Sequence, residues 1–149
     1  MAFLNSLNIV GSGMAAQQLR LDVISENITN ISTTRTEEGG TYRRKVVAME
    51  ARSNFQEALS RAQREAQGQF QVSGGGVAIT RIAEDPSALK LVYDPTHPDA
   101  NEAGYVEMPN VDMVKEMTDA MAASQAFNAN VTVFNTIKSV ISKGLEIGR

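Results

Sequence analysis

The side chains best suited to chemistry in this 149-residue chain lie in one short loop, Asp94-Pro95-Thr96-His97-Pro98-Asp99. The loop holds the only histidine of the chain between carboxylates, and imidazole and carboxylate are both common zinc ligands. A catalytic zinc normally has three protein ligands held by rigid elements, whereas the two prolines predict an irregular surface segment. We therefore predict that His97 belongs to a rigid loop and that no residue is catalytic or binds a metal.

Composition argues against several other classes of site. The chain has no cysteine, which excludes disulfides, thiolate metal sites and cysteine nucleophiles. The run Gly74-Gly75-Gly76 lacks the spacing of a phosphate-binding loop and predicts a hairpin turn instead of a cofactor or small-molecule site. A net charge of −3 gives no basic surplus for nucleic acid. The cluster Arg43-Arg44-Lys45 is short, and we expect it on the solvent or partner side of a strand.

Stepping by four and three, apolar residues near the N-terminus form a heptad row that predicts a helix over about residues 3–31. The row consists of Phe3, Leu7, Val10, Met14, Leu21, Ile24, Ile28 and Ile31, and only Gln17 interrupts it. Two glycines, Gly11 and Gly13, each weaken a helix by about 1 kcal/mol. Residues 1–34 are therefore expected to form an N-terminal helical segment that depends on partners for its stability.

The same rhythm returns at the other end and predicts a helix over about residues 110–146, within a segment 110–149. Its row is Met113, Met117, Ala120, Phe127, Val131, Phe134, Ile141 and Leu145, with exceptions at Ser124 and Lys138. Asn110 is the expected N-cap, because asparagine is a preferred capping residue. Apolar rows of this length at both ends predict self-association.

Between the helices, residues 35–109 are expected to form a small middle region rich in β-hairpins. Strand-like runs cover residues 42–49, 70–72, 77–82 and 89–93, and a short helical insertion is expected near 54–66. The predicted fold is mainly α, with long N- and C-terminal heptad helices forming a coiled-coil-like core around this middle region.

Two asparagines three residues apart, Asn27 and Asn30, occur among the last residues of the first apolar row. Asparagine is a poor helix former whose amide competes for backbone groups, so the pair suits the end of a helix and can fix the direction in which the chain leaves it. In a helix interface, a buried asparagine can also fix the register of the partner.

These residues carry a resemblance to a known family. The stretch from Asp22 to Thr33 resembles the N-terminal signature of the flagellar rod and hook family. The runs Leu91-Val92-Tyr93-Asp94-Pro95 and Gly104-Tyr105-Val106-Glu107-Met108-Pro109-Asn110-Val111-Asp112 resemble the segment that precedes the C-terminal helix of its proximal rod members. The resemblance covers about residues 2–35, 41–50 and 77–149.

This resemblance implies a structural subunit of the proximal rod, exported by the flagellar type III apparatus without a cleaved signal peptide and located in the basal body within the cell envelope. Implied partners are other copies of the chain, the rod proteins FlgB, FlgF, FlgG and FliE, and the export apparatus. The expected motif and interface residues are Asn27, Asn30, Leu7, Met14, Leu21, Ile24, Ile28, Tyr105, Pro109, Asn110, Met117, Met121, Phe127, Val131, Phe134 and Ile141. Alternatives are a distal rod or hook paralogue, a soluble helical adaptor, and a small hydrolase using His97.

Overall fold

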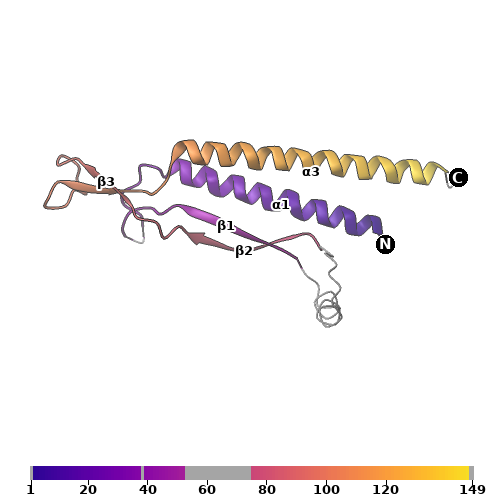
Figure 1. The fold of residues 1–149 in the computed structure, drawn as a ribbon, viewed down its shortest axis with the longest axis horizontal. Coiled ribbons are helices and arrows are strands. Elements are labelled where there is room, and N and C mark those ends of the chain that lie inside the picture. Colours follow the sequence, from indigo (N-terminus) through magenta and orange to yellow (C-terminus); the bar gives the residue numbers. More distant parts are fainter. Residues whose placement is uncertain (1, 38, 53–74, 148–149) are drawn as a thin grey trace, which may run out of the picture. The chain divides into compact units, whose positions relative to one another are not determined.

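The computed structural model describes residues 2–37, 39–52 and 75–147. Its elements run in the order α1 (Ala2–Thr29), β1 (Lys45–Ala51), β2 (Val77–Glu84), β3 (Lys90–Tyr93), β4 (Tyr105–Met108) and α3 (Met113–Ile147) (Figure 1). Backbone contacts divide them into two compact units. The first unit comprises residues 2–18, 49–52, 75–80 and 125–147, and the second unit comprises residues 19–48 and 81–124.

The predicted terminal helices and the small paired strands between them are confirmed, whereas coiled-coil packing of the helices stays a prediction. β1 pairs with β2, and β3 pairs with β4 in antiparallel register, Leu91 opposite Glu107 and Tyr93 opposite Tyr105. Strand β4 was not expected, because its four residues lie between two turn-rich loops. The predicted run 70–72 and helical insertion 54–66 lie outside the described residues, and the three-segment division of the chain also stays a prediction.

In the first unit, a serine of α1 holds the beginning of β2. The hydroxyl of Ser12 accepts a hydrogen bond from the backbone N–H of Val77 at 3.0 Å and donates to the carbonyl of Ile9 at 2.7 Å. Gly76 precedes this contact with φ +100°, and a Cβ there would collide with the Ser12 Oγ. Only glycine therefore fits the turn that brings β2 to α1.

The second unit places its apolar core between the end of α1 and the beginning of α3. Val23 and Ile24 of α1 are each 5% exposed, and Val106, Val111 and Ala123 are at most 2% exposed. These side chains come from segments far apart in the sequence. Burial of apolar surface is the main favourable term in such a core.

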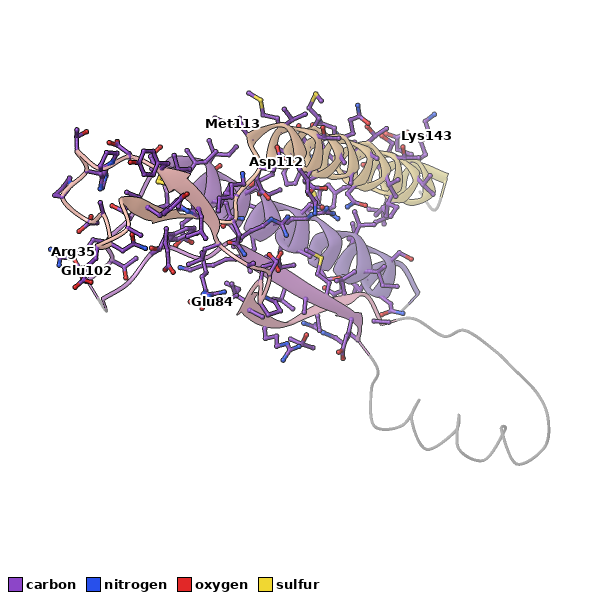
Figure 2. All side chains as sticks on the ribbon, turned by 60° about the vertical axis from the view of Figure 1, so that its left-hand side comes forward. Arg35, Glu84, Glu102, Asp112, Met113 and Lys143 are labelled. Carbon is purple, nitrogen blue, oxygen red and sulfur yellow. The ribbon has the colours of Figure 1, made fainter. Side chains whose placement is uncertain are left out.

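Helix α3 begins one residue after an aspartate cap, as Figure 2 shows at the labelled residues Asp112 and Met113. The Asp112 Oδ1 accepts hydrogen bonds from the N–H groups of Val114 at 3.0 Å and Lys115 at 3.4 Å. The expected N-cap at Asn110 is therefore wrong. The amide of Asn110 is bound elsewhere in the second unit, which leaves the cap to the next oxygen-bearing side chain, a residue type equally suited to it.

In the first unit, α1 and α3 approach closely at a glycine. A Cβ on Gly13 would lie 3.1 Å from the Asn130 Nδ2, whereas a Cβ on Gly11 would have no atom within 4 Å. The two glycines are therefore present for different reasons, since only Gly13 is needed for the approach of the helices.

We predict that Gly11→Ala raises the free energy of unfolding by about 1 kcal/mol, because alanine favours the helix and nothing opposes its Cβ. Gly13→Ala should give a smaller gain or a loss, because Asn130 must move. Urea denaturation followed by circular dichroism measures both. Equal gains for the two variants would contradict the close approach at Gly13.

Candidate functional site

Asn27, in the last turn of α1, is the centre of a buried polar cluster in the second unit. Its side chain is fully buried, and its amide nitrogen donates to the Lys45 carbonyl at 2.9 Å and to the Glu116 Oε2 at 3.2 Å. Its Oδ1 accepts from the Lys45 N–H at 2.8 Å and from the Tyr42 hydroxyl at 2.9 Å. The side-chain amide thus uses both of its donors and both acceptor positions.

A buried ion pair adjoins this amide. Glu116 of α3 is fully buried, and its Oε1 accepts a hydrogen bond from the Arg44 Nε at 2.6 Å. The Arg44 side chain is 13% exposed, and it also lies 3.5 Å from Asp85 and 3.5 Å from Asp119. Burial acts to lower the pKa of Arg44, but Glu116, Asp85 and Asp119 together raise it above its usual value. The guanidinium is therefore held in its charged form.

A second cation lies at the edge of the cluster. The Lys45 ammonium pairs with the Glu26 carboxylate and lies 5.7 Å from the centre of the Tyr42 ring. Burial raises the pKa of Tyr42 to about 12, and the charges of Glu26, Glu116 and Glu84 add to this rise. The phenol is therefore protonated at neutral pH and available as a donor to Asn27.

The amide of Asn110 fixes three further backbone positions. Its Oδ1 accepts from the Arg44 N–H at 2.8 Å, and its Nδ2 lies 3.2 Å from the Asp85 carbonyl and 3.3 Å from the Ser87 carbonyl. Asn110 therefore ties the residue before β1 to the segment after β2, three residues before α3 begins.

Asn30, by contrast, acts locally on the end of α1. Its Nδ2 donates to the Glu26 carbonyl at 3.0 Å, and its Oδ1 accepts from the Thr33 hydroxyl at 3.1 Å. The Glu26 carbonyl also accepts the backbone N–H of Asn30 at 3.0 Å, so the backbone and the side chain of Asn30 both bind the last turn of α1. Any role of either asparagine in the register of an assembly stays a prediction.

The other predicted interface residues lie at different depths. The α1 residue Ile24 is buried, and the remaining predicted residues of α1 are half-buried: Leu7, Met14, Leu21 and Ile28. Pro109 is fully buried, whereas Tyr105 is 43% exposed. On α3, the half-buried residues are Phe127, Val131, Phe134 and Ile141. Their part in an interface stays a prediction.

Two predicted interface residues near the beginning of α3, Met117 and Met121, face outward. Met117 is 55% exposed and Met121 is 62% exposed, while Glu116 and Ala123 on the other side of the helix are fully buried. In this part of α3 the inward-facing row therefore consists of a carboxylate and small residues, and the large apolar side chains face away from the core.

The buried ion pair of Arg44 and Glu116 was not predicted from the sequence. The expectation that the cluster 43–45 faces solvent or a partner is wrong for Arg44, which the buried Glu116 binds. One signal was available in the sequence. Glu116 lies seven residues before Ala123, so the two residues share one side of the helix. Nothing in the sequence identifies the arginine that binds Glu116.

The His97 loop is held by hydrogen bonds within itself and to Thr34. The His97 Nδ1 accepts from the Asp99 N–H at 3.1 Å, and the Asp99 Oδ2 accepts from the Thr34 hydroxyl at 2.8 Å. Hydrogen bonds from Thr96 lower the pKa of Asp94.

Among residues 2–37, 39–52 and 75–147, no three histidine or acidic side chains are grouped to hold a metal ion. Over the same ranges, no helix is long and apolar enough for a membrane span.

We predict that Asn27→Ala lowers the free energy of unfolding by about 3 kcal/mol or more, because it leaves several buried polar groups without partners. Asn30→Ala is the matched control and should cost about 1 kcal/mol, since its groups can bind water instead. Urea denaturation measures both. Equal losses would contradict the central position of Asn27.

The pKa of Tyr42 predicts a loss of stability at alkaline pH. The unfolded phenol ionises near pH 10, whereas the folded phenol keeps its proton up to about pH 12. The stabilising contribution is complete below pH 10 and falls as the pH rises to 12, because ionisation then favours the unfolded chain. Tyr42→Phe should remove this part of the pH dependence in urea denaturation. An unchanged alkaline slope would contradict the assignment.

Two family descriptions match separate parts of the chain. Residues 7–35 match the family described as flagella basal body rod protein, and residues 102–147 match the family described as flagellar basal body rod FlgEFG protein C-terminal. The first match ends after Asn30 and the second contains Asn110 and Glu116, so the buried cluster joins the two matched parts.

Relatives that match the chain over its whole length are also flagellar basal-body rod proteins. A protein of Bacillus subtilis named flagellar basal-body rod protein FlgC is 41% identical, with 100% of both chains covered. Its namesake in Borreliella burgdorferi is 42% identical over 99% of this chain and 98% of its own. The Salmonella typhimurium protein of that name is 39% identical with both chains fully covered. The chain therefore belongs to the FlgC family of flagellar basal-body rod proteins.

Proposed function

We propose that the chain is a non-enzymatic structural subunit of the rod of the flagellar basal body. Its relatives over the whole length carry the name of a basal-body rod protein, which supports this assignment. The buried cluster is consistent with it, because Asn27, Arg44 and Glu116 bind one another and hold chain segments in place. A subunit of a rod must resist deformation, and a saturated polar network provides rigidity.

The observation that carries the proposal is the amount of apolar surface exposed on the second unit. Its exposed large apolar residues are Val46, Ile82, Leu91, Val92, Tyr93, Tyr105, Met113, Val114, Met117 and Met121. Gathered apolar side chains on a surface mark sites of association. In an assembled rod, neighbouring subunits would cover them.

The finer features of the assignment rest on the resemblance to the rod and hook family. They are the proximal position in the rod, assembly through the terminal helices into a tube that transmits torque and surrounds the export channel, and passage through the type III apparatus. FlgB, FlgF, FlgG and FliE are the proposed neighbours in the basal body within the cell envelope.

The assignment can be tested in a flagellated strain that lacks its own copy of this gene. A tagged version of the chain should restore swimming, and a label against the tag should mark the rod in purified basal bodies. Swimming restored by a chain that never enters basal bodies would contradict a structural role.

In the same strain we predict that Phe134→Asp abolishes swimming. Phe134 lies on the expected assembly side of α3, where a carboxylate in an apolar interface costs several kcal/mol. His97→Ala is the control and should preserve swimming, because that side chain accepts a hydrogen bond from the Asp99 N–H of its own loop. Counting rod-containing basal bodies distinguishes failed assembly from failed rotation. Full swimming with Phe134→Asp would contradict the assignment of this side of α3 to the interface.

A further inference from the structure

One face of the β3–β4 hairpin carries exposed apolar side chains. Because side chains alternate along a strand, Leu91, Tyr93, Tyr105 and Glu107 share one face and Val106 lies on the other. Val106 is 2% exposed, whereas Leu91 and Tyr93 are 64% and 65% exposed. The rings of Tyr93 and Tyr105 meet edge to face with their centres 5.2 Å apart. We call these four residues the tyrosine face.

The beginning of α3 carries a second exposed apolar surface in the same unit. Val114, Met117 and Met121 are 74%, 55% and 62% exposed, and their spacing of three and four residues places them on one side of the helix. On the same side of the helix, the residue seven positions after Met121 is the polar Asn128. The apolar surface is therefore confined to the first turns of α3, and we call its three residues the methionine row.

Resting on the proposed rod function, we propose that the tyrosine face of one copy docks on the methionine row of the next copy. The two surfaces are complementary in chemistry, because thioethers make favourable contacts with aromatic rings. They are also complementary in charge, since Glu107 belongs to the tyrosine face and Lys115 lies beside the methionine row, and both are exposed. Opposite charges at such a rim fix the register of two partners.

The geometry of this contact suits a rod. The two surfaces are different parts of the chain, so the contact joins unlike surfaces of neighbouring copies. Contacts of this kind repeat from subunit to subunit and generate rings or helical assemblies, whereas contacts between identical surfaces end at a dimer. Each copy would therefore contact one neighbour through its tyrosine face and another neighbour through its methionine row.

The chain has no cysteine, so cysteine cross-linking can test the contact directly. Two differently tagged variants, Tyr93→Cys and Met117→Cys, are co-expressed with the wild-type chain, and their basal bodies are purified and oxidised. We expect a disulfide-linked dimer carrying both tags. Asn128→Cys replaces Met117→Cys in the control and should give no dimer with Tyr93→Cys. If either variant is excluded from the rod, Leu91→Cys or Val114→Cys reports on the same two surfaces.

Each remaining outcome counts against the proposal. Tagged chains that enter the rod without forming the mixed dimer would overturn the docking and leave the rod function intact. Dimers formed only between two Tyr93→Cys chains would replace it with a contact between identical surfaces. A wild-type chain absent from basal bodies would overturn both the docking and the rod function.

Discussion

Burial of the Glu116 carboxylate is the constraint on which the second unit depends. A buried charge costs several kcal/mol unless an opposite charge and hydrogen bonds compensate it. Arg44 supplies the charge and Asn27 supplies the remaining hydrogen bond. Because both partners come from other parts of the sequence, the end of α1, the residues before β1 and the first turn of α3 must meet for any of them to be stable.

The same constraint determines which surfaces face outward. With Glu116 directed into the cluster, the helical repeat turns Met117 and Met121 away from the core. Asn110 binds the Arg44 N–H before β1 and the Asp85 carbonyl after β2, which ties the two ends of the first strand pair together. The cluster that stabilises the second unit thereby also leaves the tyrosine face and the methionine row exposed.

Local signals in the sequence were sufficient for the helices and insufficient for the cluster. The heptad rows and the small residues around them predict both long helices, because a helix is specified by residues three and four apart. Asn27 could be singled out as a residue unsuited to a helix interior. Its partners could not, because the contact between Asn27 and Glu116 spans 89 residues and depends on how the elements pack. The N-cap of α3 was predicted at Asn110 and is Asp112 for the same reason, because Asn110 binds residues far away in the sequence.

The central claim concerns the coupling between Arg44 and Glu116, and a double-mutant cycle measures that coupling directly. The free energies of unfolding of Arg44→Ala, Glu116→Ala and the double variant are compared with that of the wild-type chain. Because Arg44→Ala leaves the fully buried Glu116 carboxylate without an opposite charge, and this cost disappears when Glu116 is also replaced, the double variant should be more stable than the sum of the single effects by about 2 to 3 kcal/mol. Single effects that add within about 0.5 kcal/mol would show that the ion pair is not the constraint that organises the second unit.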